Sequence, residues 1–310
     1  MIVGNGLSLD MREAAGDRLL AWNTSRPLHW DVRAPDNNET QFLRMLPRLA
    51  AFIEEARILN PSNSDFELFE RIANLSSEAV FEYGSAFELL IETRHFLNIA
   101  YSNFQMRADA VRLDEWAWKA WTDSYAGALT FAVSFNYDLV LERLFAASGI
   151  QVRGFGIDGE NHGLRVLKPH GSIDFDVDAQ IINMGRITYP LKKWITLNDM
   201  PLRRLSASEM MKARTDLNIV LPGQATHARQ FQWVEPGFRH FQSFAATWTD
   251  CVVVGVSYWE CDRPEVDCLL DSFRPGTMIH LVDPNPSSDL RRALQKRGLV
   301  LRCSDGPPDI

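Results

Sequence analysis

The chain has 310 residues, of which 46% are hydrophobic and 23% are charged, and its formal net charge is -8 at pH 7. This composition is typical of a globular protein, and the length suffices for an α/β core with one substantial insertion. The acidic balance gives no electrostatic reason for sequence-independent binding to DNA or RNA, so we expect no nucleic-acid partner. The basic residues that could form a local patch are interpreted as a solvated face; they are Arg203, Arg204, Lys212 and Arg214.

The chain holds four cysteines, Cys251, Cys261, Cys268 and Cys303, and none belongs to a C-x-x-C pair. Without that spacing no zinc module is predicted, and so few cysteines in a chain of this length indicate reduced thiols. The first residues show neither a basic segment nor a long apolar run, and no stretch approaches the length of a transmembrane helix. We therefore expect a cytoplasmic protein without a membrane partner.

The N-terminal half is predicted to be mostly helical after a short first strand over residues 1–3. Residues 37–127 carry apolar side chains at helical spacing; Leu49, Phe52, Ile53 and Ala56, for example, mark one buried helix face. Asp65 is predicted to cap the helix that follows. We interpret residues 37–127 as a helical subdomain inserted between the first two strands of the core.

From residue 128 onward, apolar runs typical of buried strands alternate with helical patterns. The predicted strands cover residues 128–134, 150–152, 165–168, 217–221, 252–256, 278–282 and 299–302. The predicted helices cover residues 139–148, 238–248 and 287–297, and Pro264 opens a further helix. This alternation favours an α/β fold, a Rossmann-like doubly wound parallel sheet, within a single domain that spans residues 1–310 and includes the helical insertion.

Gly4 and Gly6 follow the first strand, and the lack of side chains there would let the backbone approach a pyrophosphate. The start of the next helix would offer its N–H groups to the negative charge, with Asn5 and Ser8 in the same turn. The complete G-x-G-x-x-G fingerprint is absent, and a simple tight turn is the alternative interpretation.

Asn136 and Asp138 follow the strand over residues 128–134. An asparagine side chain both donates and accepts hydrogen bonds, which suits a carboxamide, a ribose hydroxyl or a held water molecule. Asp138 could accept a hydrogen bond from the amide of a ligand. The alternative for both residues is structural, because an Asn or Asp ahead of a helix is the expected N-cap chemistry.

His170 lies between Pro169 and Gly171, just past the strand over residues 165–168. The proline restrains the approaching chain and the glycine removes bulk behind the imidazole, so we expect this side chain to point into a cleft. The ordinary pKa of an imidazole lies near neutrality, which suits a base that accepts a proton from a ribose hydroxyl or from water. The other histidines are interpreted as structural or exposed.

Gly255, Ser257 and Asp283 also fall at the ends of predicted strands. Gly255 and Ser257 could form a second backbone cradle, and Asp283 is placed like the acidic residues that bind the hydroxyls of an adenosine ribose. The alternative for Asp283 is a turn through the Pro-Asn-Pro that follows it. Because ligands of open α/β sheets bind at the carboxyl ends of the strands, we expect all of these residues to meet in one crevice.

Other chemistries lack their motifs in this chain. The sequence contains no G-x-S-x-G elbow, no P-loop and no H-E-x-x-H, and its histidines and cysteines are not spaced as metal ligands. We therefore expect no metal cofactor.

In this order the motifs resemble the sirtuin-like superfamily, and specifically its prokaryotic members that lack zinc. The resemblance runs the length of the chain, with the helical segment as a typical insertion, and it rests on residues 4–8, 134–139, Glu142, 168–174, 253–257 and 282–283. Abortive-infection proteins that start with Gly-Asn-Gly are similar as well.

The resemblance implies a sirtuin-like NAD-binding domain in which Asn136 and His170 are catalytic, His170 as the base. It further implies that NAD is held by Gly4, Asn5, Gly6, Ser8, Asp138, Gly255, Ser257 and Asp283. Two departures argue against acyl-lysine binding. The deacetylase branch carries a four-cysteine zinc module that this chain lacks, and it has Gln and Ile where this chain has Phe135 and Tyr137.

The activity implied is that of an NAD glycohydrolase, for which NAD is the substrate and nicotinamide and ADP-ribose are the products, acting as an effector in bacterial antiphage defence. We expect a cytoplasmic homo-oligomer that works beside a separately encoded ATPase or Argonaute-like sensor. Two alternatives stay open. One is a non-catalytic regulatory module that binds NAD or ADP-ribose, and the other is an NAD-dependent protein deacylase or ADP-ribosyltransferase.

Overall fold

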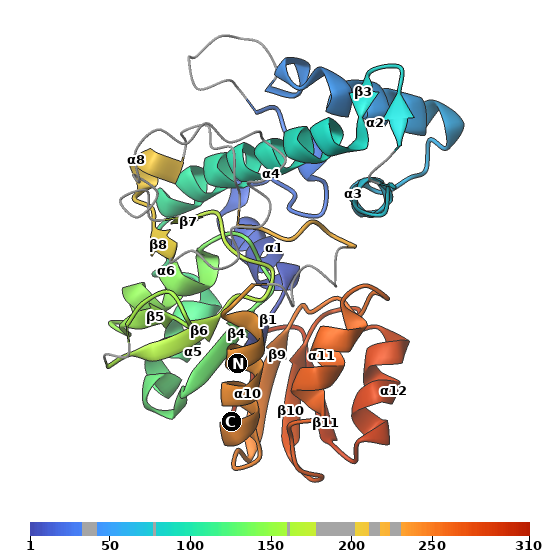
Figure 1. Cartoon of the computed structure of the whole chain (residues 1–310). Helices are drawn as coiled ribbons and strands as arrows, with labels where there is room; N and C mark the ends of the chain where they lie inside the picture. The colour runs from blue at the N-terminus through green and yellow to red at the C-terminus, as the bar shows by residue number, and fades with distance from the viewer. Residues whose placement is uncertain (33–41, 77–78, 160–161, 178–201, 211–217, 224–230) are drawn as a thin grey trace.

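The computed structural model describes residues 1–32, 42–76, 79–159, 162–177, 202–210, 218–223 and 231–310. Its central sheet has seven strands in the order β11-β10-β9-β1-β4-β6-β5 (Figure 1), and every neighbouring pair is parallel. The strands are β1 (Ile2–Val3), β4 (Phe131–Ser134), β5 (Val152–Gly154), β6 (Leu164–Leu167), β9 (Asp250–Val254), β10 (Met278–Val282) and β11 (Val300–Ser304). The predicted α/β class, a Rossmann-like doubly wound parallel sheet, is confirmed.

Both faces of the sheet are buried, which explains why its strands are continuous apolar runs. Val3 joins the core on one face, where the covering helices are α1 (Asn5–Ala14), α5 (Ala117–Tyr125) and α6 (Val140–Ala147). Buried residues of α4 (Ala86–Asp109) belong to the same hydrophobic cluster. Ile2 joins the core on the other face. That face is covered by α10 (Val234–Ala245), α11 (Arg263–Leu270) and α12 (Ser288–Lys296), drawn in orange and red in Figure 1.

The segment between β1 and β4 is mostly helical. It contains α2 (Pro47–Leu59), α3 (Asp65–Ala73), α4 and α5, with a short hairpin of β2 (Val80–Phe81) and β3 (Gly84–Ser85). The buried side chains of these helices belong to the same hydrophobic cluster as Val3 and the strands around it. The helical segment therefore shares one core with this face of the sheet.

Two serine caps set the starts of α3 and α4. Ser64 and Glu67 form a capping box at α3, and Ser85 and Glu88 form another at α4. The prediction that Asp65 caps a helix is wrong, because Ser64 does so. The buried Asp65 carboxylate instead accepts a hydrogen bond from the backbone N–H of Leu28 at 2.9 Å.

The chain between β6 and α10 departs most from the predictions. The strand predicted over residues 217–221 is wrong, because within residues 218–223 only Ile219 forms a bridge, to Gly171. An antiparallel pair, β7 (Phe175–Val177) and β8 (Leu202–Arg204), precedes the short helix α8 (Ala207–Met210). Two of the four residues of the predicted basic face, Arg203 and Arg204, form ion pairs with acidic residues. The other two, Lys212 and Arg214, lie outside the described residues.

The topology changes direction at β1, and this creates the crevice. After β1 the chain continues into α1 on one face of the sheet, whereas after the neighbouring β9 it continues toward α11 on the other face. In open α/β sheets such a switch point opens a crevice at the carboxyl edge, where ligands bind. No helix in the described ranges is long and apolar enough to cross a membrane.

Candidate functional site

A cavity of about 650 Å³ lies at the carboxyl edge of the sheet. It is lined by residues that follow β1, β4, β6, β9, β10 and β11, together with residues of α3, α4 and α5. The predicted site residues on its wall are Gly4, Asn5, Gly6, Asn136, Asp138, His170, Gly255, Ser257 and Asp283. Ser8 is the exception, because it is fully buried and does not line the cavity. Its hydroxyl forms hydrogen bonds with two residues that do, Asn136 and Asp138.

The glycines of the first motif allow two loops to touch each other. A Cβ atom on Gly6 would lie 2.4 Å from Gly255 Cα, and one on Gly255, whose φ is +50°, would lie 2.2 Å from Gly6 Cα. The N–H of Gly6 also donates to the Gly255 carbonyl at 3.1 Å. Gly6 and Gly255 are therefore required by the contact between the β1 and β9 loops, whether or not a pyrophosphate also approaches them.

The start of α1 keeps one backbone donor available at the cavity. Gly4 N–H donates to the Val254 carbonyl at 2.9 Å, but the N–H of Asn5 has no acceptor in the part of the chain that the structure describes. The positive end of the α1 dipole lies at the same place. Together these features favour an anionic group at this point of the wall.

Asn136 and Asp138 join the loops that follow β1 and β4. The Asn136 amide donates to the Gly4 carbonyl at 3.0 Å and to Ser8 Oγ at 3.1 Å. Ser8 Oγ in turn donates to Asp138 Oδ2 at 2.7 Å. Both amide protons of Asn136 are thereby used, while its Oδ1 receives no hydrogen bond from any described residue. This oxygen is the atom that Asn136 can offer to a ligand.

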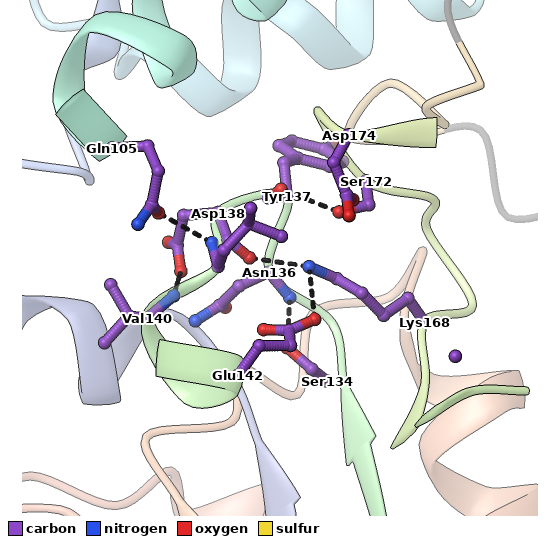
Figure 2. Close-up of polar contacts among 12 residues, drawn as sticks. Gln105, Ser134, Asn136, Tyr137, Asp138, Val140, Glu142, Lys168, Ser172 and Asp174 are labelled. Atoms are coloured by element: carbon purple, nitrogen blue, oxygen red, sulfur yellow. Dashed lines mark hydrogen bonds and ion pairs between the residues drawn. The ribbon is translucent and has the colours of Figure 1, made fainter. Parts of the chain in front are cut away.

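Asp138 also has a structural role, although the N-cap residue of α6 is Leu139 and not Asp138 as the alternative supposed. Its Oδ1 accepts the backbone N–H of Val140 at 3.0 Å, at the start of α6 (Figure 2). Burial raises the pKa of Asp138, and the nearby Lys168 and the Ser8 hydroxyl oppose that rise. The side chain is thus fully engaged within the protein, although it lines the cavity.

Lys168 is a buried cation beneath these loops. Its Nζ donates to the Asp138 carbonyl at 2.6 Å and lies 3.2 Å from a carboxylate oxygen of Glu142 (Figure 2). Only 1% of the Lys168 side chain is exposed. The ammonium group therefore connects the loop after β4, the helix α6 and the segment that leads to His170.

His170 is held by an acidic partner from the first turn of α11. Its Nε2 lies 2.8 Å from Glu265 Oε2, and its ring meets that of Phe135 edge-on with centroids 5.1 Å apart. Burial alone lowers the pKa of His170, but the Glu265 carboxylate, with smaller contributions from Asp262 and the Phe135 backbone, raises it above the ordinary value of 6.5. The imidazole is therefore stabilised as a cation.

Gly171 is required for a reason other than the predicted one, which was to remove bulk behind the imidazole. Its φ is +79°, and a Cβ atom there would lie 1.8 Å from the Asn218 carbonyl oxygen. The close approach lets the His170 carbonyl accept the N–H of Val220 at 2.9 Å. The backbone that carries the imidazole is thus held by the segment over residues 218–220.

The cavity wall is acidic. The carboxylates on it belong to Asp10, Glu13, Asp138, Asp262, Asp283 and Asp305, and no lysine or arginine is among the described lining residues. A phosphate-bearing ligand would depend for its anion contacts on the start of α1 and on backbone donors. A ligand group that is positively charged would be favoured beside the carboxylates.

Several residues of the site were not predicted from the sequence. Glu265 and Asp262, from the start of α11, face His170. Phe66 of α3 and Trp259 line the cavity and meet edge-on with ring centroids 5.1 Å apart. One signal pointed to Asp262, because a polar residue shortly before Pro264 is a helix-start pattern. No sequence signal pointed to the others.

Cys261 is a further lining residue whose chemistry the structure restricts. Burial, followed by the neighbouring Asp262, raises the pKa of its thiol to about 12. A thiol nucleophile must be deprotonated to react. Cys261 is therefore not the nucleophile of this site at neutral pH.

His170, Asp262 and Glu265 also form a group that could hold a metal ion, because one ligand atom from each lies within 4.8 Å of the others. Sequence spacing gave no sign of it, since the histidine and the acids are far apart in the chain. The expectation of a metal-free site stays a prediction.

Comparison with protein-family models finds no matching family, and comparison with curated proteins finds no match. The sirtuin-like interpretation therefore depends on the motifs and on the site that they form.

Proposed function

We propose that this protein is an NAD glycohydrolase, which splits NAD into nicotinamide and ADP-ribose. The observation that carries the proposal is that Asn136 and His170 line the same cavity, beside the start of α1. The Asn136 amide oxygen, which can accept a hydrogen bond, and the titratable imidazole of His170 thus lie in the same cavity as the start of α1, where an anion can bind. The cavity volume of about 650 Å³ lies in the range of small-molecule sites.

The proposed reaction breaks the bond between the nicotinamide nitrogen and C1′ of the ribose. The electron pair of that bond leaves with nicotinamide, and positive charge develops on the ribose. Asn136 orients the ribose and the attacking water through its Oδ1, the water oxygen bonds to C1′, and His170 accepts the released proton. The carboxylates on the wall stabilise the cationic ribose.

The direct test is incubation of the purified protein with NAD, at dilute and at concentrated protein, with nicotinamide and ADP-ribose followed by chromatography. We expect His170→Ala and Asn136→Ala to lose turnover by about 10²- to 10⁴-fold, the usual cost of removing a general base. His162→Ala, at an exposed histidine, is the matched control and keeps the wild-type rate. Undiminished turnover in both site variants would reject this site assignment.

A second function, a module that binds NAD or ADP-ribose without cleaving it, is favoured by one observation. The Nε2 of His170 is already engaged by Glu265, and the pKa of the ring is raised, so the neutral imidazole is less available as a base than in an unperturbed histidine. Calorimetry with NAD, followed by chromatography of the same sample, separates the two functions. Binding without release of nicotinamide supports the module. The deacylase alternative, the role in antiphage defence and the ATPase or Argonaute-like partner stay predictions of the resemblance.

A further inference from the structure

His170, Asp262 and Glu265 bring three atoms that can ligate a metal ion to one point of the protein. His170 Nε2 lies 2.8 Å from Glu265 Oε2 and 4.0 Å from Asp262 Oδ1, and the three ligand atoms lie within 4.8 Å of one another. Nitrogen and oxygen ligands lie about 2.0–2.2 Å from a tetrahedral zinc ion, and hence about 3.4 Å from each other. That separation falls between the two observed ones, so small side-chain movements place all three atoms around one ion.

The hydrogen bonds behind these atoms are those that metal ligands usually have. A metal-bound histidine almost always donates its other ring N–H to a backbone carbonyl, a carboxylate or water, and ligating carboxylates are themselves hydrogen-bonded. The His170 ring donates a hydrogen bond to the Phe135 backbone, and since Nε2 faces Glu265 the donor is Nδ1. Asp262 Oδ2 accepts a hydrogen bond from Ser257 Oγ at 2.8 Å. Nε2 and one oxygen of each carboxylate are therefore the atoms that this group offers to an ion.

Glu265 carries a charge that its described contacts compensate only in part. Its side chain is 1% exposed, and its second oxygen, Oε1, has no hydrogen-bond partner among the described residues. Burying a carboxylate is costly unless it is paired, and a divalent cation beside Glu265 would offset that cost. His170 and Asp262 line the cavity, so an ion can reach the group from there, and the acidic wall attracts it.

The ligand set selects the class of ion. Imidazole suits Zn²⁺ and the neighbouring transition-metal ions, whereas Mg²⁺ and Ca²⁺ prefer sites made of oxygen alone. We propose that His170, Asp262 and Glu265 bind one divalent transition-metal ion of the Zn²⁺ class, and that the bound ion inhibits NAD cleavage. This proposal departs from the prediction of a metal-free site, which was made from sequence spacing.

The inhibitory role rests on the proposed function, whereas the binding of the ion does not. Because Nδ1 is bonded to the Phe135 backbone, Nε2 is the ring nitrogen that can take a proton from the attacking water. A metal ion uses the same electron pair of Nε2, so a ring that holds the ion cannot act as the general base. Metal binding and cleavage therefore exclude each other at His170.

The test is calorimetric titration with Zn²⁺, without NAD, of the purified protein after removal of any affinity tag. We expect one bound ion per chain in the wild type and much weaker binding of Mg²⁺. Loss of a hydrogen bond behind a metal ligand lowers affinity by about 10- to 100-fold, so loss of a ligand should cost at least about 100-fold. The ligand variants are His170→Ala, Glu265→Gln and Asp262→Ala. Asp262→Ala, at a partly exposed residue, keeps the test decisive if Glu265→Gln does not fold.

Thiols and exposed imidazoles also bind zinc, so three further variants are the controls. Cys303→Ser and His162→Ala remove exposed groups far from the cavity wall, and Cys261→Ser removes a thiol whose Sγ lies 3.6 Å from Asp262 Oδ1. We expect all three controls to keep the wild-type affinity. Wild-type protein that binds no Zn²⁺, or ligand variants that bind it as tightly as the wild type, overturn the proposal.

The inhibitory role is measured with NAD as the substrate. Saturating Zn²⁺ should lower the rate of nicotinamide release by about 10²- to 10⁴-fold, as removal of a general base does, and EDTA should restore it. Loss of cleavage with EDTA and its recovery with Zn²⁺ would overturn the inhibitory role. A wild-type protein that never cleaves NAD, with or without EDTA, rejects the proposed function instead, while the Zn²⁺ titration still decides the metal site.

Discussion

Ser8 Oγ donates a hydrogen bond to Asp138 Oδ2 over 2.7 Å, and this contact joins the helix after β1 to the loop after β4. Asp138 also accepts the Val140 N–H, so Asp138→Ala leaves two buried donors unpaired. Each unsatisfied buried group costs about 1–3 kcal/mol. We expect Asp138→Ala to lower the free energy of unfolding by about 2–6 kcal/mol, and Asp138→Asn to cost less because its amide oxygen can replace one acceptor.

The same carboxyl group should make stability depend on pH. Its pKa is raised above the ordinary 3.8, so the folded state holds a proton that the unfolded chain has already lost. Stability from this group is therefore largest at low pH and declines as pH rises through the raised pKa. Urea unfolding at several pH values should show Asp138→Asn gaining relative to wild type as pH rises above 4. A constant difference between the two proteins would contradict the raised pKa.

The contact between Gly6 and Gly255 gives a third prediction. Alanine at either position places a Cβ within 2.4 Å of the other glycine's backbone, and Gly255 also has a positive φ. Overpacking of this kind costs about 1–3 kcal/mol, and we expect Gly6→Ala and Gly255→Ala each to lose at least that much. Gly127→Ala is the control, because a Cβ there meets nothing within 4 Å. Thermal unfolding that fails to separate these variants from Gly127→Ala would refute the steric reason.

The order of strands and helices was predictable because each buried strand is a separate apolar run. Residues 278–282 were placed correctly, and their strand is flanked by clear turn residues. Of the strand predicted over residues 217–221, the described part, residues 218–221, was misassigned, since an apolar run identifies burial but not pairing. That segment packs against Gly171 through a single bridge and covers the His170 loop instead of extending the sheet. Its burial comes from tertiary contacts that no local pattern contains.

The site residues that follow strands were predictable, and those that come from helices were not. Gly4, Asn136 and His170 follow β1, β4 and β6, so a parallel sheet brings them to one edge. Glu265 reaches His170 from a helix on the other face of the sheet, across 95 residues of sequence. Phe66 enters from the helical segment between β1 and β4. Such contacts depend on how the elements pack, which spacing alone does not contain.

The buried pair of Lys168 and Glu142 gives a fourth prediction. Removing one member of a buried ion pair leaves an unpaired charge and costs about 3–5 kcal/mol, whereas replacing both with apolar side chains is often neutral. We expect Lys168→Met to lower the free energy of unfolding by that amount, and Glu142→Leu in the same chain to restore most of it. The measurement is urea unfolding of the two single variants and the double variant. If the double variant is no more stable than Lys168→Met, the loss of stability does not come from breaking the ion pair with Glu142.

The edge-on contact of Phe66 and Trp259 gives the last prediction. Trp259 is 46% exposed, yet it lines the cavity, which suits a ring that a flat ligand group can stack on. Alanine replacement of a stacking aromatic weakens nucleotide binding by about 1–3 kcal/mol per base. We expect Trp259→Ala to weaken binding of ADP-ribose by about tenfold, measured by calorimetry, and Trp259→Phe to keep most of the affinity. Phe244, also 46% exposed but on α10 away from the cavity, supplies the control Phe244→Ala. Equal affinity in Trp259→Ala and this control would show that Trp259 does not contact the ligand.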